Sequence, residues 1–528
     1  MHILFLTDNF PPEVNAPASR TYEHCREWVK EGHEVTVITC APNFPKGTIY
    51  EGYQNLLTPH RELMDGIQVV RVWSYITANQ GFIKRTLDYI SFMISAILAS
   101  FAVRKVDMVV GTSPQFFTAC AAYFVGLYQR SPFVFELRDL WPESIEAVGA
   151  VRNRMVLGLL EMVELFLYHN AAAVVSVTDS FKRNLIRRGI SESKIKVITN
   201  GVDLSRFVPC PKDEALTLQL GLKGKFVVGY IGTHGMAHGL ETVLTAAKTL
   251  QDAGEQDIAF LMLGDGACKS ELERVAGQQG IKNVEFVSSV GKNEVVRYWS
   301  ILDASVIHLK NEEAFAKVIP SKLFECMGMG IPVLHGVKGE SADIVEELRI
   351  GLTFEPENSN QMCKSILKLR EDVMLRDEFR SNCTRQAGKF DRKTKAIEML
   401  ECLKGIKSPS NNPESKFSSC LRWAFWLNCL AVVAFSLLPP NNLPSFDFQI
   451  SWEDKLLHGA AFLALCMMGS WSYLERSYSL IIGLLALGGA IEISQYATGW
   501  RHMEVYDFVA NAAGILVGRG IFRLFRPK

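Results

Sequence analysis

The stretch VIPSKLFECMGMGIPVLHG, Val318–Gly336, predicts a short helix followed at once by a buried strand. Pro320 and Ser321 are typical of a helix start, and we expect Ser321 at the N-cap. A glycine at position 328 or 330 should end the helix, because glycine accepts the left-handed backbone of a C-terminal cap. The apolar run Ile331–Leu334 is then predicted as a short strand inside a sheet.

Lys322 and Glu325 lie three residues apart in the first turn of this predicted helix. Free backbone N–H groups and the helix dipole attract anions to a helix N-terminus, and a lysine there adds positive charge for a phosphate. A glutamate one turn further along cannot bind phosphate, but it can accept hydrogen bonds from ribose hydroxyls. The alternative is an ordinary surface Lys–Glu pair at i, i+3, which any helix can carry.

Composition bounds the class of protein. The chain of 528 residues is long enough for two to four domains. Basic and acidic residues balance at 56 each, so no long-range field favours nucleic acid. The 12 cysteines include no CxxC pair, which predicts a reducing compartment without a disulfide framework or structural zinc. The start, MHILFLTDNF, lacks the basic region and long apolar core of a signal peptide.

Short apolar runs alternate with helical patterns through the first 208 residues, for example with a helix predicted at Ala18–Glu31. Because the runs are continuously apolar, they predict a parallel sheet with helices on both faces. Ligands bind such sheets at the carboxyl ends of the strands. The predicted strands are Ile3–Thr7, Val35–Cys40, Val69–Trp73, Met108–Thr112, Phe133–Leu137 and Val174–Thr178.

The loop after the first predicted strand, Asp8–Pro17, contains no glycine. A pyrophosphate therefore cannot approach its backbone as in a dinucleotide-binding fold. This half is a poor NAD domain, and we expect it to face an acceptor substrate. Asn15 in the loop and Arg20 in the next helix are the acceptor-binding candidates. Arg20 would hold an anionic part of the acceptor, and the alternative is an ordinary surface arginine.

A second loop, Glu136–Ser144, concentrates charged and aromatic residues. Asp139, with Arg138 beside it, is the candidate for taking or holding a proton. Trp141 offers an aromatic plate to a sugar or a lipid. The alternative is that Arg138 and Asp139 form an ion pair that only holds the loop.

Thr86–Val103 is the longest apolar stretch of this half, and it includes Asp88. The stretch is marginal for a membrane span, so we expect a helix that is buried or lies on a membrane surface. Lysine and arginine residues at 84, 85, 104 and 105 flank it and suit contact with anionic lipid.

A proline-containing link, Val208–Pro211, marks a domain boundary, with a hinge for closure expected near Pro209. A second alternating unit follows. Its first strand leads into the glycine-rich turn Gly232–Gly239, a phosphate-cradle candidate before the helix Leu240–Leu250. Backbone groups at Ser288-Ser289, after the third strand, are candidates for reading a base. The predicted strands are Phe226–Ile231, Ala259–Leu263, Val284–Val287, Ala304–Leu309 and Ile331–Leu334.

Several motifs occur in an order that resembles family 4 glycosyltransferases of the GT-B fold. They are Asn200-Gly201-Val202-Asp203, the turn at Gly232, Gly264-Asp265-Gly266 and PSKLFE at 320–325. With PPEVNAPASR at 11–20 and ELRDLWPES at 136–144, the resemblance narrows to the WbuB-like bacterial branch, which adds amino sugars to surface polysaccharides. It covers the chain up to residue 405 or so.

The resemblance implies a retaining transfer from a nucleotide-diphosphate sugar, with no metal and no other cofactor. Glu325 would hold the ribose, and Ser321 and Lys322 would hold the diphosphate. Phosphate or sugar would contact the glycine turn, and Ser288 completes the predicted donor site. The turn residues are Gly232, Thr233, His234 and Gly235.

Three positions depart from the family pattern. The first glutamate of the family's E-x7-E pair would fall at Lys317, so the expected partner of the donor sugar is missing. The basic residue that is common in the glycine turn is absent, although His234 and His238 stand there. Where many relatives have His-Asp in the first-domain catalytic loop, this chain has Arg138-Asp139.

A polar linker, residues 408–420, precedes four apolar segments. Each segment is near or slightly below spanning length, which predicts an all-α four-helix transmembrane bundle over residues 421–528. Basic residues before the first and after the last segment place both termini in the cytoplasm. The predicted segments are Trp423–Leu438, Leu456–Leu474, Tyr478–Ile491 and Val505–Phe522.

The tail also carries the polar motifs DKLLH at 454–458, EISQ at 492–495 and RHMEVYDFVANAAG at 501–514. This pattern resembles VanZ-like membrane domains. Ionisable groups inside a membrane are costly and suggest a function. The two interpretations are an anchor with interhelical hydrogen bonds and a site for a lipid headgroup or polyprenyl chain.

Together these features predict two Rossmann-like α/β domains, 1–208 on the acceptor side and 209–407 on the donor side, before the linker and tail. The predicted activity moves a sugar, an N-acetylated hexosamine, from a UDP-type donor to a polyprenyl-diphosphate-linked acceptor in surface polysaccharide synthesis. It would take place on the cytoplasmic face of the bacterial inner membrane. The alternatives are a nucleotide-sugar 2-epimerase of GT-B fold, which needs no membrane tail, and a non-catalytic membrane scaffold.

Overall fold

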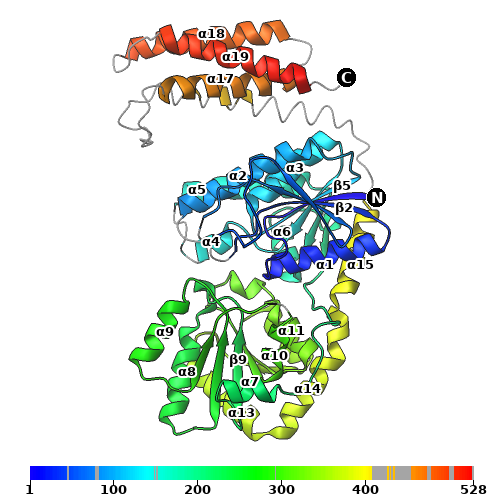
Figure 1. Cartoon of the computed structure of the whole chain (residues 1–528), viewed down its shortest axis with the longest axis vertical. Coiled ribbons are helices and arrows are strands. Elements are labelled where there is room, and N and C mark those ends of the chain that lie inside the picture. The colour runs from blue at the N-terminus through cyan, green and yellow to red at the C-terminus, as the bar shows by residue number, and fades with distance from the viewer. Residues whose placement is uncertain are drawn as a thin grey trace. The chain divides into compact units, whose positions relative to one another are not determined.

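A computed structural model of the chain has two compact units, Met1–Ser408 and Pro409–Lys528, each of which is described by itself. The first unit contains two α/β domains, each built around one sheet, as predicted (Figure 1). The structure describes residues 1–44, 47–77, 82–147, 149, 153–291, 293–406, 425–426, 428–429, 432–433, 453–472, 477–498 and 505–525.

The first domain has an eight-stranded sheet in the order β3-β4-β2-β1-β5-β6-β7-β8. The continuous apolar runs form its parallel centre, because every residue of β1, β5 and β6 is buried. The edge strand β3 pairs antiparallel with β4 and is not predicted, since its sequence HRELM is largely polar and exposed. The strands are β1 (His2–Leu6), β2 (Glu34–Cys40), β3 (His60–Met64), β4 (Ile67–Val72), β5 (Met108–Thr112), β6 (Phe133–Leu137), β7 (Ala173–Ser176) and β8 (Ile195–Val197).

Helices of the first domain begin at side-chain caps. The Asn15 side chain accepts a hydrogen bond from the Ala18 backbone N–H at 2.9 Å at the start of α1. Asn153 and Thr178 cap α5 and α6 in the same way, which satisfies N–H groups that have no partner inside the helix. The helices are α1 (Ala16–Lys30), α2 (Phe82–Ser100), α3 (Phe116–Gln129), α4 (Glu143–Ala147), α5 (Arg154–Asn170) and α6 (Asp179–Arg187).

The second domain has a six-stranded parallel sheet in the order β11-β10-β9-β12-β13-β14. The five predicted strands are confirmed to within two residues at each end, and β14 is additional. The helix predicted from the opening stretch is α11, which ends at Gly330 with a left-handed φ of 69°. The strands are β9 (Phe226–Ile231), β10 (Ile258–Leu263), β11 (Val284–Val287), β12 (Ala304–His308), β13 (Val333–Gly336) and β14 (Gly351–Thr353). The helices are α7 (Glu214–Gln219), α8 (Glu241–Asp252), α9 (Lys269–Gln278), α10 (Val295–Ser300), α11 (Lys322–Met329), α12 (Glu340–Glu347), α13 (Ser359–Glu371) and α14 (Val373–Ala387).

The chain passes between the two domains twice, once around Val202 and again around Phe390. The passages pair: the Val202 N–H donates to the Phe390 carbonyl, and the Arg392 N–H donates to the Val202 carbonyl, both at 2.9 Å. Gly201 permits this contact, because a Cβ there would lie 2.2 Å from the Phe390 carbonyl oxygen. The motif Asn200–Asp203 therefore belongs to a double crossing, whereas the sequence predicts a single hinge near Pro209.

The last helix of the unit, α15 (Arg392–Lys404), returns to the first domain and packs on α1. The Trp28 indole N–H donates to the Ala396 carbonyl at 2.8 Å, and Met399 and Leu400 complete the first domain's core. The predicted boundaries, which give residues up to 407 to the second domain, are therefore wrong for this helix.

The apolar stretch at Thr86–Val103 corresponds to α2. Phe92 and Ala96 face the core, whereas Leu87 is 51% and Leu98 is 59% exposed. Neighbouring helices α3 and α5 add further exposed apolar side chains. We name these side chains the α2–α3–α5 apolar face: Leu87, Ile94, Leu98, Phe124, Tyr128, Met155, Leu159, Met162 and Phe166.

The second unit contains three long described helices, α17 (Glu453–Ser472), α18 (Ser477–Thr498) and α19 (Val505–Phe525). They share an apolar core that includes Phe462, Leu484 and Ile515. Among the helices that the structure describes, none combines the length and the apolarity needed to cross a membrane. The last three predicted spans fall on these helices, and the first, Trp423–Leu438, lies largely outside the described residues.

Candidate active site

A cavity of about 630 Å³ lies in the first unit where loops of both sheets meet. Its lining residues follow the carboxyl ends of strands in both domains, including β1, β9, β10 and β12. This is where parallel sheets bind ligands. The first domain contributes Asp8, Glu13, Asn15, Arg85 and Asp88, and the second contributes Gly232, Thr233, His238, Asp265, Ser289, Ser321, Lys322 and Glu325, among others.

The glycine turn after β9 lies directly against the loop after β10. The Gly232 N–H donates to the Leu263 carbonyl at 2.9 Å, and the His234 N–H donates to the Asp265 carbonyl at 3.0 Å. A Cβ at Gly264 would lie 1.8 Å from the Gly232 carbonyl oxygen, so only glycine lets the two loops touch. The predicted phosphate cradle therefore consists of two touching loops, one after β9 and one after β10. Their contact explains why both the Gly232 turn and the Gly264-Asp265-Gly266 motif need glycine.

Lys322 places a buried ammonium beneath this turn. Its Nζ lies 3.6 Å from the centroid of the Tyr230 ring, and a Cβ at Gly232 would come within 2.9 Å of it. Nζ has no hydrogen-bond partner among the described residues. Burial lowers the pKa of Lys322 to about 7, because apolar surroundings penalise the charged form. An anion entering the cavity would supply the missing partner and restore the charge.

Ser321 and Glu325 also line the cavity on either side of Lys322. Ser321 precedes α11 with a helical backbone, and its side chain caps no N–H group. Its hydroxyl instead accepts a hydrogen bond from the Asn200 side chain at 3.2 Å. The predicted N-cap position of Ser321 is therefore confirmed, although its hydroxyl contacts the interdomain crossing and makes no capping hydrogen bond.

Three residues of the predicted donor site, His234, Gly235 and Ser288, do not line the cavity. His234 is fully buried beneath the turn, and burial lowers its pKa to about 4, so its ring is neutral. The Ser288 hydroxyl accepts a hydrogen bond from Lys269 at 3.0 Å. Ser289, the other residue of the predicted pair, lines the cavity.

Lys317, the position where the family pattern has a glutamate, joins the two domains. Its Nζ lies 2.8 Å from the Glu143 carboxylate of α4. Its backbone carbonyl accepts a hydrogen bond from the Thr178 hydroxyl at 3.1 Å. A second interdomain contact lies nearby, where the Glu340 carboxylate accepts backbone N–H groups at the start of α6 at 3.0 and 2.6 Å. Lys317 therefore has a structural partner in the first domain.

The first-domain wall of the cavity is acidic. Burial raises the pKa of Glu13 and of Asp88 to about 7 each, and it raises the pKa of Asp8 as well. The Glu13 carboxylate accepts hydrogen bonds from the Asn43 and Phe44 backbone N–H groups at 2.7 and 2.8 Å. Sequence signals for this wall exist: Asp8 directly follows a strand, and Asp88 interrupts an apolar run. The wall offers hydrogen-bond partners to sugar hydroxyls.

Comparison with known families accounts for both domains. Residues 18–206 match the model of Glycosyltransferase Family 4, and residues 214–389 match that of Glycosyl transferases group 1. The chain is a family 4 glycosyltransferase of the GT-B fold. It is therefore a transferase enzyme, which sets aside the epimerase and the non-catalytic scaffold.

Relatives of this glycosyltransferase extend over most of the first unit. The colanic acid biosynthesis glycosyl transferase WcaI of Escherichia coli is 27% identical, over 62% of this chain and 82% of its own length. The GDP-mannose-dependent alpha-mannosyltransferase of Mycolicibacterium smegmatis is 24% identical, over 67% of this chain and 84% of its own length.

Solved structures share the fold of the glycosyltransferase. Sucrose-phosphate synthase from Thermosynechococcus elongatus superposes with a TM-score of 0.62 at 16% identity, over 76% of this chain and 98% of its own. Anabaena HepE in complex with UDP-glucose gives a TM-score of 0.58 at 18% identity, over 76% and 99%. At these identities the likeness concerns the fold alone.

Arg20 of the glycosyltransferase is not at the acceptor wall. It is 2% exposed, and its guanidinium donates to the Glu136 carboxylate at 2.8 Å and to the Ile198 and Thr199 carbonyls at 3.2 and 2.9 Å. The predicted role in holding the acceptor is therefore wrong, because a buried ion pair occupies the side chain. Arg85, at the start of α2, lines the cavity instead.

Of the other acceptor candidates, Asn15 lines the cavity and Trp141 does not. The Trp141 ring stacks on Phe116, with ring centroids 5.4 Å apart. The half-buried indole thus packs against the first domain outside this cavity, and its contact with a sugar or lipid stays a prediction.

Arg138 and Asp139 of the glycosyltransferase follow β6 and lie outside the cavity lining. Their backbone N–H groups donate to the Ser113 hydroxyl at 2.7 and 3.2 Å, and the Arg138 guanidinium donates to the Pro17 carbonyl at 3.3 Å. Burial lowers the pKa of Arg138 to about 10 and raises that of Asp139 to about 6. A carboxyl group with that pKa suits proton transfer near neutral pH, so the catalytic assignment of this pair stays a prediction.

Proposed function

We propose that this enzyme is a retaining glycosyltransferase that moves an N-acetylated hexosamine from a UDP-type donor to a polyprenyl-diphosphate-linked acceptor during surface polysaccharide synthesis. The observation that carries the proposal is the buried Lys322 ammonium beneath the Gly232 turn, at a cavity with one wall from each domain. Departure of a nucleotide diphosphate develops negative charge, and a preorganised cation at that position stabilises it.

The donor has a consistent place on the second-domain wall. Its diphosphate contacts the N-terminus of α11 and Lys322, where backbone N–H groups and the dipole favour anions. Its ribose hydroxyls donate hydrogen bonds to Glu325, which lines the cavity one turn further along α11. Ser289 is within the same wall and takes the role predicted for Ser288 beside the base.

Relatives support a sugar donor of this class and leave its identity to experiment. HepE has been crystallised with UDP-glucose, and the mycobacterial relative is GDP-mannose-dependent. The name of WcaI refers to colanic acid biosynthesis, which supports a polysaccharide product here. The choice of an N-acetylated hexosamine rests on the WbuB-like motifs at residues 11–20 and 136–144.

A lipid-linked acceptor fits the first domain. The α2–α3–α5 apolar face lies on the same domain as the acidic wall, and α2 contributes both Leu87 to that face and Asp88 to the cavity. Large exposed apolar patches mark interaction sites, including membrane contacts. Arg85 lines the cavity at the start of the same helix and is placed to contact an acceptor phosphate.

The test is transfer by membranes from cells that express the full chain, with labelled UDP- and GDP-sugars and a polyprenyl-diphosphate-linked sugar as acceptor. One donor should give labelled lipid, the Lys322→Met variant should give none, and the new anomeric bond should keep the donor's configuration by NMR. If wild-type membranes label only water-soluble sugars, the transferase stands and the lipid-linked acceptor is rejected.

We further propose that the enzyme acts on the cytoplasmic face of the bacterial inner membrane and that its tail is a VanZ-like membrane domain. Support comes from the apolar face and from the basic residues that flank the tail, and a tether raises the effective concentration of a membrane-bound acceptor. Alkaline carbonate extraction tests it: an integral tail keeps the full chain in the pellet, whereas a chain released to the supernatant is held only at the surface.

A further inference from the structure

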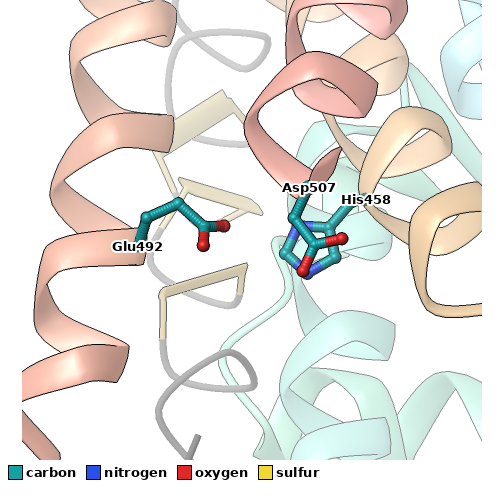
Figure 2. A group of neighbouring side chains, drawn as sticks. All are labelled: His458, Glu492 and Asp507. Atoms are coloured by element: carbon teal, nitrogen blue, oxygen red, sulfur yellow. The ribbon is translucent and has the colours of Figure 1, made fainter. Parts of the chain in front are cut away.

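Three polar side chains from three helices meet inside the second unit, far in sequence from the transferase site. His458 lies on α17, Glu492 on α18 and Asp507 on α19. One ligand atom from each lies within 4.8 Å of the others, and all three residues are buried. Figure 2 shows the Glu492 carboxylate pointing toward the Asp507 carboxylate and the His458 ring.

Close helix packing fixes two of these side chains in place. A Cβ at Gly514 of α19 would lie 2.1 Å from the Gly459 carbonyl oxygen of α17, and one at Gly518 would lie 2.8 Å from the Leu463 carbonyl oxygen. Glycine at these positions therefore lets the two backbones touch. His458 adjoins the first contact, so the close approach of α17 and α19 accounts for the short distance between the His458 and Asp507 side chains.

The His458 ring has a defined orientation. Its Nδ1 lies 3.2 Å from the Asn511 side-chain oxygen, which can only accept, so Nδ1 carries the proton. Nε2 then carries no proton, and its lone pair is available to bind a metal ion. Imidazoles that bind metals are typically held in this way, by a hydrogen bond from the other ring nitrogen.

Polar atoms at the centre of the cluster lack hydrogen bonds. Asp507 is 5% and Asn511 is 1% exposed, yet Asp507 Oδ1 and Asn511 Nδ2 have no hydrogen-bond partner among the described residues. The contact that Asp507 Oδ1 makes is with the Lys455 ammonium, at 3.5 Å. A buried carboxylate oxygen in this state is costly unless a further group coordinates it.

We propose that His458, Glu492 and Asp507 bind a divalent metal ion. One imidazole nitrogen with two carboxylates favours Mn²⁺ or Zn²⁺ over Mg²⁺, which prefers oxygen ligands. Ligand distances of about 2.1 Å require the three atoms to lie within about 4.2 Å of each other, so the side chains close by roughly half an ångström. Three protein ligands leave a position for water or a phosphate oxygen, and the Asn511 amide N–H group is placed to donate to it.

The experiment measures metal on the purified full-length chain after chelation and desalting. Mn²⁺ and Zn²⁺ are added separately, with Mg²⁺ as the comparison, and bound metal is counted by mass spectrometry and, for Mn²⁺, by electron paramagnetic resonance. We expect one equivalent of Mn²⁺ or Zn²⁺ on the wild type and none on the isosteric variants Asp507→Asn and Glu492→Gln. Asn511→Ala should weaken binding about 10–100-fold, as for other partners of metal-bound histidine.

Ile515→Val is the matched control, because it alters the same buried core on α19 and leaves every ligand in place. It should bind one equivalent, like the wild type. A thermal melt of the wild type gives a second readout that does not depend on the folding of any variant. Its melting temperature should rise when Mn²⁺ or Zn²⁺ is added. Wild-type protein that binds no more metal than the Asp507→Asn/Glu492→Gln double variant, or that shows no metal-dependent melting, would overturn the proposal.

Discussion

The two walls of the cavity have opposite electrostatics. The donor-side wall holds a buried cation, Lys322, whose pKa burial lowers to about 7. The acceptor-side wall holds Glu13 and Asp88, whose pKa values burial raises to about 7. Near pH 7 these groups are therefore close to half ionised, so a bound substrate can shift Lys322 toward its charged form and the two carboxyl groups in either direction.

This difference indicates how the enzyme distinguishes its two substrates. In the proposed function, a nucleotide diphosphate that binds beneath the Gly232 turn raises the pKa of Lys322, so the lysine carries its full positive charge only when the donor is bound. The proposed acceptor would instead contact carboxyl groups that can donate or accept hydrogen bonds with hydroxyls.

Lys322→Met should reduce transfer by about 10³-fold, because the leaving diphosphate loses its preorganised cation. The same variant should melt at a higher temperature, since it removes a buried ammonium that has no hydrogen-bond partner among the described residues. Between pH 7 or so and 10.5, the unfolded wild type binds more protons at this position, so wild-type stability should rise with pH relative to the variant.

Lys338→Met is the control for this change, because Lys338 is an exposed lysine of the same domain, paired with Glu355. It should leave transfer unchanged. Normal turnover by the Lys322→Met enzyme would contradict the proposed role of the Lys322 ammonium in stabilising the leaving diphosphate.

Glu325→Gln should raise the donor KM by about 10–100-fold, since a hydrogen bond to a charged group contributes about 1.5–3 kcal/mol. The acceptor KM should stay the same, because Glu325 belongs to the donor-side wall. Steady-state kinetics with each substrate varied in turn measures both constants, with the exposed Glu347→Gln as control. Equal effects on the two KM values would contradict the assignment of walls.

Asp88→Asn should flatten the pH dependence of acceptor binding. As pH rises from about 6 to 8, Asp88 and Glu13 ionise, and the acceptor KM of an anionic acceptor should increase several-fold through repulsion. The variant should show a smaller increase, and the exposed Glu31→Gln variant should follow the wild type. A wild-type acceptor KM that falls over this range would contradict the acidic-wall interpretation.

The Lys317–Glu143 ion pair should have the smallest effect. Its side chains are 20% and 34% exposed, so solvent screens them and a coupling of at most about 1 kcal/mol is expected. A double-mutant cycle with Lys317→Met and Glu143→Gln, read out by kcat, measures that coupling. The Lys338–Glu355 pair lies within one domain and should give no coupling in kcat. A coupling well above 1 kcal/mol would indicate that Lys317 also contacts substrate.

Most strands and the helix that carries Lys322 and Glu325 can be predicted from the sequence, because each depends on a pattern within a few neighbouring residues. Continuous apolar runs place β5, β6, β9 and β11 at their observed residues, and a lysine with a glutamate one turn later identifies α11. The role of Arg20 is mispredicted because its partner Glu136 is 116 residues away in the sequence. The contact of the Ser321 hydroxyl is not predicted because Asn200 is 121 residues away. A short sequence window contains the residue but not the partner that determines its role.

The same reason explains the domain boundary. α15 has the composition of an ordinary amphipathic helix, and nothing in it indicates that Met399 and Leu400 complete the core built by the first residues of the chain. Lys317 similarly departs from the family pattern, and only the structure shows that its ammonium pairs with the Glu143 carboxylate of the other domain, 2.8 Å away.

The paired crossing at Gly201 and Phe390 is the covalent connection between the two lobes of the enzyme. Because α15 belongs to the first domain, the second unit continues from the acceptor-side lobe, and the donor-side lobe is joined to the rest through the two adjacent crossings. These two connections form a pivot that permits rotation while opposing separation. In the proposed function, rotation of the donor-side lobe about this pivot would open the cavity to the nucleotide without breaking either connection.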